Sequence, residues 1–284
     1  MLLDALLDLV LPQACPGCGA EGVRWCRECA AELRRVAAIP LGRTAPDPVP
    51  PGFPTAAAAA SYDGVVRAAL VAHKERGRLG LAGPLGEALA TAVVLLDPPA
   101  GVLLVPVPSA TAVVRERGHD HARRLARAAA GALRRGGVPA RAAPLLRPAR
   151  VVADQAGLDA TGRAVNLRGA FVARRDLLGV QVVVVDDVVT SGATLAEATR
   201  SLTRAGAVVI GAATVAATRR KRPPGVPPDR CPSAEGGTTV GLETLRKQRS
   251  PGALSAGKEG DPRRTSAVSP GHEPARGGSA WTSL

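Results

Sequence analysis

The chain has 284 residues, of which 46% are hydrophobic and 21% charged. These values are close to those of ordinary globular proteins and exclude a collagen-like or wholly disordered chain. No apolar run reaches the roughly 18 residues that a membrane span needs. Residues 1–11 contain two aspartates and neither Lys nor Arg, so they lack the positively charged start of a secretory signal. We therefore expect a cytoplasmic protein of one or two domains.

Lys and Arg number 37 and Asp and Glu 24, which gives a formal net charge of +13. Residues 1–220 carry +9 of this excess, because they contain 27 basic and 18 acidic residues. The positive charge is spread along the chain and favours polyanionic partners. Phosphorylated small molecules and nucleic acid both fit this charge.

Composition divides the chain into three predicted segments. Residues 1–50 hold four of the five cysteines and run into a proline-rich stretch, Pro46–Pro54, which is typical of a linker. Residues 55–220 alternate strand-like and helix-like stretches. Residues 221–284 are rich in Pro, Gly and Ser without apolar periodicity, so we predict a disordered tail.

The N-terminal cysteines have the spacing of a structural metal site. Cys15 and Cys18 form one Cys-x2-Cys pair, and Cys26 and Cys29 form the second. Two such pairs can hold a tetrahedral Zn²⁺, and four thiolates leave no open position for catalysis. Disulfide or redox chemistry and plain structural thiols are the alternatives, but disulfides are rare in the cytosol. We predict a zinc ribbon with Trp25 beside the metal.

The middle segment predicts strands that alternate with helices. The expected strands are residues 56–62, 102–105, 138–143, 170–173, 181–185 and 207–215. The expected helices are residues 65–76, 79–96 (interrupted at Gly83-Pro84), 121–135 and 193–205, the last closed by Gly206. This alternation predicts an α/β fold with a parallel sheet.

The most informative stretch is Val182–Thr194. Four consecutive valines predict a central strand, Asp186 and Asp187 follow at its expected end, and a short hydroxyl-rich loop then opens a helix. Ligands of parallel sheets bind at this carboxyl edge, and the N–H groups of a helix start suit a phosphate. Gly192 allows the backbone to approach the anion closely.

The paired carboxylates would repel a bare phosphate. They fit a ligand that carries hydroxyl groups or a bound Mg²⁺ next to its phosphate, as a ribose 5-phosphate does. The stretch has no Gly-Lys-Ser/Thr and only one glycine, so it is neither a P-loop nor a dinucleotide fingerprint. An ordinary strand-to-helix turn with a Ser/Thr cap is the alternative.

These thirteen residues resemble the 5-phosphoribosyl-1-pyrophosphate (PRPP) signature of type I phosphoribosyltransferases. Further blocks make residues 1–220 similar to the ComF family of competence-associated, phosphoribosyltransferase-like proteins. Those blocks are the four cysteines, Tyr62-Asp63-Gly64, Lys74, Gly77, Val105-Pro106-Val107-Pro108, Arg115-Glu116-Arg117-Gly118, Gln155, Leu158, Arg163, Asn166 and Gly169-Ala170-Phe171.

The resemblance implies a Rossmann-like type I phosphoribosyltransferase domain that binds PRPP with Mg²⁺. The implied 5′-phosphate site consists of Thr190, Ser191, Gly192, Ala193 and Thr194. Asp186 and Asp187 would hold the ribose hydroxyls and stabilise positive charge during catalysis. The implied pyrophosphate site consists of Val107, with exposed backbone amides, together with Arg115, Arg117 and Lys74.

Some residues depart from the family pattern. Arg117-Gly118 is followed by His119-Asp120-His121 where the family has Phe-Asn-Gln, and Val152 stands where a threonine is expected. The two histidines are either general bases or exposed loop residues. Gln155, Arg163 and Asn166 receive no assigned role.

Two functions follow from the resemblance. In the first, the protein transfers a phosphoribosyl group from PRPP to an acceptor that the sequence does not identify. In the second, it is an accessory protein of DNA uptake that binds single-stranded DNA and works with the uptake machinery, and the PRPP fold serves as a sensor or docking module.

Overall fold

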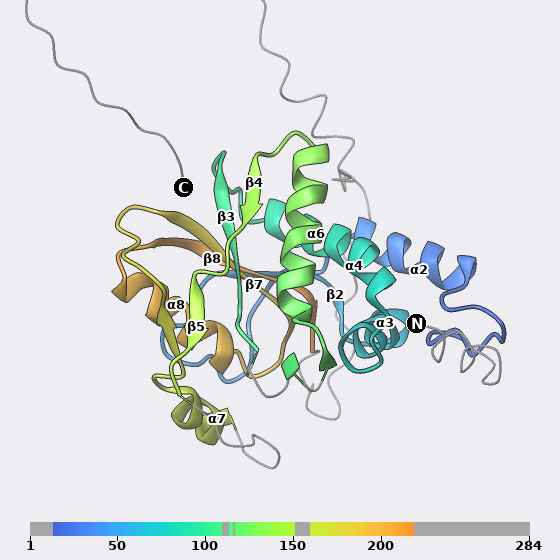
Figure 1. Cartoon of the computed structure of the whole chain (residues 1–284), viewed down its shortest axis with the longest axis horizontal. Coiled ribbons are helices and arrows are strands. Elements are labelled where there is room, and N and C mark those ends of the chain that lie inside the picture. The colour runs from blue at the N-terminus through green and yellow to red at the C-terminus, as the bar shows by residue number, and fades with distance from the viewer. Residues whose placement is uncertain (1–13, 110–113, 116, 151–159, 219–284) are drawn as a thin grey trace, which may run out of the picture. The chain divides into compact units, whose positions relative to one another are not determined.

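The computed structural model of the chain describes residues 14–109, 114–115, 117–150 and 160–218 (Figure 1). The tail that we predict to be disordered, together with Val152, Gln155 and Leu158, lies outside these residues. The helices are α2 (Arg27–Ala38), α3 (Gly64–Glu75), the 3-10 turn η1 (Leu79–Leu81), α4 (Ala82–Val94), α6 (His121–Arg135), α7 (Ala160–Leu167) and α8 (Ala193–Arg204). The strands are β1 (Gly42–Thr44), β2 (Ala56–Ser61), β3 (Val102–Pro106), β4 (Ala140–Ala142), β5 (Leu146–Pro148), β6 (Phe171–Ala173), β7 (Gln181–Val189) and β8 (Val208–Ala217).

The central sheet has six strands in the order β1-β2-β8-β7-β3-β4. All neighbouring pairs are parallel except β1 and β2, which are antiparallel at one edge. The valine-rich strand β7 lies between β8 and β3, and Val182–Val185 are completely buried. The predicted α/β class and parallel sheet are confirmed.

Side chains that alternate along the strands build a separate core on each face of the sheet. Val183 and Val185 pack in a core with residues of α2, α3, α4 and α6. Val182 and Val184 pack in a second core with α8 and the small antiparallel pair β5–β6. Figure 1 shows α4 and α6 on one side and α8 with β5 on the other.

Small side chains let these layers approach closely. Residues Ala56–Ala60 of β2 are all buried. Gly86 of α4 lies so close to α6 that an added Cβ would be 2.3 Å from the Cβ of Ala128. The alanine- and glycine-rich composition thus allows close helix packing with few aromatic residues.

Strand β7 is longer than we predicted. It continues to Val189 and pairs with β8 up to that residue. Asp186 and Asp187 therefore lie within the strand and do not follow its end. Residues 171–173 form a strand, as predicted, but this strand pairs with β5 outside the parallel sheet. Helix α4 begins at Ala82, and Pro84 stands in its first turn, where proline removes no helical hydrogen bond.

The proline-rich stretch that was predicted to be a linker contacts the main domain. Pro46 is buried, and Phe53 packs at the edge of the core beneath α8. Strand β1, which the sequence did not predict, adds the preceding residues to the sheet. Within the described part of the chain, every helix is too short or too polar to cross a membrane.

Candidate functional site

A cleft of about 310 Å³ opens where β7 ends and α8 begins. Five of the predicted site residues line it together: Lys74, Asp186, Asp187, Thr190 and Thr194. The remaining lining residues are Tyr62, Leu70, Val71, Glu75 and Val188. The cleft therefore joins α3 to the carboxyl edge of the sheet, the position expected for a ligand.

Gly192 shapes the loop between the strand and the helix. It is the N-cap of α8 with a left-handed φ of 73°, and its carbonyl accepts the first helical hydrogen bond from Ala196 N–H at 2.9 Å. The N–H groups of the following turn have no partner within the helix, and N–H groups in this position suit an anion. An added Cβ at Gly192 would lie 2.7 Å from the Phe53 ring and 2.8 Å from Pro46.

The predicted phosphate loop divides between two pockets. Thr190 and Thr194 line the acidic cleft. Ser191 and Ala193 line a different, mainly apolar pocket of about 690 Å³ beside the proline-rich stretch. The side chains of Ser191 and Ala193 are thus placed apart from the acidic cleft.

Lys74 is the cation of the cleft. Its Nζ donates to Asp187 Oδ2 at 2.9 Å, and the Asp187 side chain is only 8% exposed. Burial opposes the charge of both groups, but their mutual attraction raises the pKa of Lys74, and Lys74 and His121 lower the pKa of Asp187. The two groups are therefore an ion pair at neutral pH.

Asp186 is in a different electrostatic state. Burial and the charge of Asp187 raise the pKa of Asp186 well above its ordinary value. Its Oδ1 accepts the backbone N–H of Asp187 at 2.8 Å. The positive charge of Lys74 therefore does not neutralise both Asp186 and Asp187. The cleft favours binding of a further cation or of hydroxyl groups that donate hydrogen bonds.

His121 also reaches the acidic pair. Its Nε2 lies 3.7 Å from Asp187 Oδ2, and its Nδ1 lies 3.5 Å from Ser109 Oγ. Burial lowers the pKa of His121 to about 4, so its ring is neutral at neutral pH. Asp120 orients this residue, because its carboxylate accepts the Arg123 N–H at 3.0 Å and starts α6 at His121.

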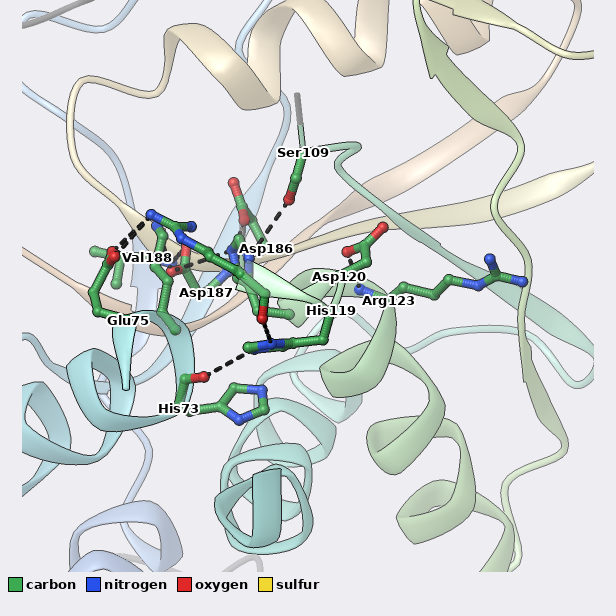
Figure 2. A network of polar contacts seen from close by, with 12 residues as sticks. His73, Glu75, Ser109, His119, Asp120, Arg123, Asp186, Asp187 and Val188 are labelled. Carbon is green, nitrogen blue, oxygen red and sulfur yellow. Dashed lines mark hydrogen bonds and ion pairs between the residues drawn. The ribbon is translucent and has the colours of Figure 1, made fainter. Parts of the chain in front are cut away.

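His119 fastens the preceding loop to α3. Its ring nitrogens lie 2.9 Å from the Arg117 carbonyl oxygen and 3.1 Å from the His73 carbonyl oxygen. Figure 2 shows His119 beside His73 and within the same polar network as Glu75 and Asp187. His119 and His121 are both buried, so the expectation that they are exposed loop residues is wrong.

Of the four residues predicted to bind pyrophosphate, Lys74 lines the cleft, whereas Val107, Arg115 and Arg117 do not. Arg117 donates to both carboxylate oxygens of Glu75, at 2.8 and 3.0 Å, and Arg115 is exposed. The backbone N–H of Val107 donates to the Val185 carbonyl at 3.0 Å. The expectation that this amide faces a diphosphate is therefore wrong, because the sheet already uses it.

The sequence missed two residues near the cleft, His73 and Glu75. Lys74 attracted attention as the one lysine of residues 1–220, and its neighbours carried no comparable signal. The position of α3 beside the end of β7 brings Glu75 to the cleft and the His73 carbonyl oxygen to His119.

The four N-terminal cysteines form a second cluster. Their sulfur atoms all lie within 4.8 Å of one another, and this arrangement could hold a metal ion. Cys15, Cys26 and Cys29 are buried and Cys18 is exposed. An added Cβ at Gly17 would lie 2.5 Å from Cys29 Sγ, so the turn between the first two cysteines requires glycine. Trp25 packs against the cluster, as predicted.

Backbone N–H groups point at these sulfur atoms. Cys26 N–H lies 3.4 Å from Cys15 Sγ, and Cys29 N–H lies 3.3 Å from Cys26 Sγ. Burial opposes ionisation of Cys15, but the N–H groups outweigh it and lower the pKa of this thiol to about 6. Burial and the neighbouring sulfurs raise the pKa of Cys29, so four thiolates need a cation among them.

One comparison with known proteins matches a region of the chain that includes part of the cleft. Residues 148–240 match the family model of the phosphoribosyl transferase domain, about a third of the chain. A search of curated proteins found no match. The matched region includes the end of β7, the loop and α8, which supply most of the cleft's polar groups. Residues 148–240 are therefore similar to a phosphoribosyl transferase domain, and the strand and helix at the acidic cleft lie within this matched region.

Proposed function

We propose that the acidic cleft binds PRPP together with Mg²⁺ and that the protein transfers the phosphoribosyl group to an acceptor. The observation that carries this proposal is the combination, in one cleft, of two adjacent aspartates with the open start of a helix. A ligand with a diol next to a phosphate matches both halves of this cleft. The phosphoribosyl transferase domain at residues 148–240 supports the same ligand.

Each group of the cleft has a role in this proposal. The N–H groups at the start of α8, with the hydroxyls of Thr190 and Thr194, bind the 5′-phosphate. Asp187, charged and buried, accepts hydrogen bonds from the ribose hydroxyls and stabilises positive charge on the ring. Asp186 binds the other hydroxyl or a water of the Mg²⁺ that PRPP brings.

In the transfer step, the bond between C1 and the pyrophosphate oxygen breaks, and its electron pair leaves with pyrophosphate. A lone pair of the acceptor forms the new bond to C1, and the acceptor's proton passes to solvent. Positioning and charge stabilisation supply most of the catalysis. Lys74 lines the cleft, and Arg117 pairs with Glu75 of the same cleft, so these two cations are our candidates to stabilise the departing charge; Arg117 must leave Glu75 to do so.

We also propose that the cysteine cluster binds a structural Zn²⁺. Four sulfurs fill a tetrahedral coordination sphere, so this ion takes no part in the reaction. The N–H groups directed at the sulfurs stabilise the thiolates that zinc requires.

Isothermal titration calorimetry with PRPP tests the proposal on the zinc-loaded full chain. We expect binding that requires Mg²⁺ and that Asp187→Asn abolishes, because this change removes a buried charge at nearly constant volume. Asp97→Asn is the matched control, since Asp97 is an exposed loop residue between α4 and β3. Undetectable PRPP binding to the native chain would contradict the proposal.

The role in DNA uptake rests on the resemblance and on the positive charge. It predicts binding of single-stranded DNA that weakens steeply with salt and that Asp187→Asn leaves unchanged. The same protein samples therefore distinguish the two functions.

A further inference from the structure

A histidine nitrogen lies against the acidic pair, and the proposed binding of PRPP does not use it. One ring nitrogen of His121 and one carboxylate oxygen from each of Asp186 and Asp187 lie within 4.8 Å of one another, and His121 Nε2 is 3.7 Å from Asp187 Oδ2. We propose that these three side chains form a binding site for a divalent transition-metal ion, which they hold without PRPP. The role of this ion in the reaction rests on the proposed function, but its binding does not.

The distances fit direct coordination after small side-chain adjustments. Two ligand atoms that each lie about 2.1 Å from one ion are separated by roughly 3.0–4.2 Å. His121 Nε2 and Asp187 Oδ2 are 3.7 Å apart, within this range. This separation is too long for a hydrogen bond, so an ion between the two atoms improves both contacts.

The histidine is held in place for this contact. Its side chain is only 8% exposed, and within the described residues its Nε2 makes no hydrogen bond. Ser109 Oγ lies 3.5 Å from the opposite ring nitrogen, Nδ1. A group on the far nitrogen is the usual means of orienting a metal-binding imidazole. Nε2 of this mostly buried side chain thus faces the aspartates.

The donor set determines the kind of ion. Mg²⁺ and Ca²⁺ prefer ligands that are all oxygen. One imidazole nitrogen with two carboxylates instead favours ions such as Mn²⁺, Fe²⁺, Co²⁺ or Zn²⁺. His121 therefore converts an acidic pair suited to Mg²⁺ into a site selective for transition metals.

Lys74 competes with this ion. Its ammonium group lies 2.9 Å from Asp187 Oδ2, the oxygen nearest to His121. The other oxygen of Asp187 accepts the Val188 N–H at 2.9 Å. A metal ion must therefore share Oδ2 with Lys74 or displace it, and removal of the lysine charge should strengthen metal binding.

Electron paramagnetic resonance of free Mn²⁺ tests this inference without PRPP. The full chain is first loaded with one equivalent of Zn²⁺, so that the cysteines are occupied, and is then titrated with Mn²⁺. We expect one Mn²⁺ site, at least about tenfold weaker binding in His121→Gln, and tighter binding in Lys74→Met. His119→Gln is the matched control, because both ring nitrogens of His119 face backbone carbonyls.

Several outcomes would overturn the inference: no Mn²⁺ binding by the native chain, equal affinity in His121→Gln, or an equal loss in His119→Gln. Far-UV circular dichroism checks the fold, and Asp186→Asn, which must also weaken Mn²⁺ binding, replaces His121→Gln if that variant does not fold. Calorimetry with PRPP and Mg²⁺ separates the two proposals. A native chain that binds Mn²⁺ but not PRPP refutes the proposed function and leaves the metal site standing.

Discussion

The cysteine cluster takes all four of its side chains from residues 15–29. The acidic cleft takes Lys74 from α3 and its aspartates from β7, and His121 at the start of α6 lies beside these aspartates. In the first, two tight turns and the N–H groups of nearby residues place the sulfurs. In the second, no two of the three elements are adjacent along the chain, and the parallel sheet has to form before the groups meet.

This difference shows how each cluster depends on the rest of the protein. The cysteine cluster has little core of its own, and Leu33 and Ala37 of the following helix pack into the main core. The aspartates of the acidic cleft directly follow the completely buried valines of β7. We therefore expect metal removal to affect the first cluster by unfolding, and substitutions in the second to affect mainly binding.

Removal of zinc is the change with the largest expected effect. A chelator, or Cys15→Ser, should unfold residues 14–38 and lower the melting temperature of the remainder, because α2 contributes to the main core. Structural zinc contributes on the order of 10 kcal/mol to small domains. Zinc content and circular dichroism on chelator titration measure this effect. The fifth cysteine of the sequence, Cys231, provides the control Cys231→Ser, and an equal loss in that variant would argue against the four-cysteine site.

Gly192→Ala tests the phosphate loop. It introduces a Cβ 2.7 Å from Phe53 and forces alanine to adopt a φ of 73°. We expect a loss of about 1–3 kcal/mol in the free energy of unfolding and weaker PRPP binding. Gly137→Ala, with a φ of 82° and no atom within 4 Å of its Cβ, isolates the conformational cost. Equal losses in chemical denaturation of both variants would show that the contact with the proline-rich stretch is unimportant.

The prediction with the smallest expected effect concerns two ion pairs, one in α8 beside the acidic cleft and one in α2 beside the cysteine cluster. In α8, Arg200 donates to both oxygens of the buried Glu197 at 2.7 Å, and in α2, the exposed Arg35 makes the same pair with the half-exposed Glu32. Glu197→Gln should cost roughly 1–2 kcal/mol at neutral pH. Glu32→Gln should have almost no effect, because water screens exposed pairs.

The two glutamates also predict a pH dependence. Burial opposes the charge of Glu197, but Arg200 outweighs it and lowers the pKa of this carboxyl below 4.5. Its contribution to stability is therefore complete above about pH 4.5 and is lost as the pH falls through the lower, folded-state pKa. Thermal melts between pH 3 and pH 7 should show a smaller acid-induced loss in Glu197→Gln than in the native chain. Parallel pH profiles would contradict this assignment.

Local pattern was enough to predict much of this protein. Each feature that was predicted lies within one short stretch of sequence. These features are the two Cys-x2-Cys pairs, the four valines, the two aspartates and the helix that begins after Gly192. Each reports a short-range physical requirement, such as a tight turn, a buried strand or an unpaired helix start. The α/β class, the parallel sheet and the grouping of Asp186, Asp187, Thr190 and Thr194 were accordingly predicted.

Tertiary structure alone decided what surrounds those groups. Side-chain polarity gave no indication that Val107 N–H is used by the sheet, that Arg117 pairs with Glu75, or that Ser191 lines another pocket. The sequence left open whether His121 is a general base or an exposed loop residue, and the packing of α6 against the sheet buries it beside Asp187. The contacts of Val107, Arg117 and His121 join residues more than 40 positions apart. Their formation depends on the whole core, so a short stretch of sequence cannot predict them.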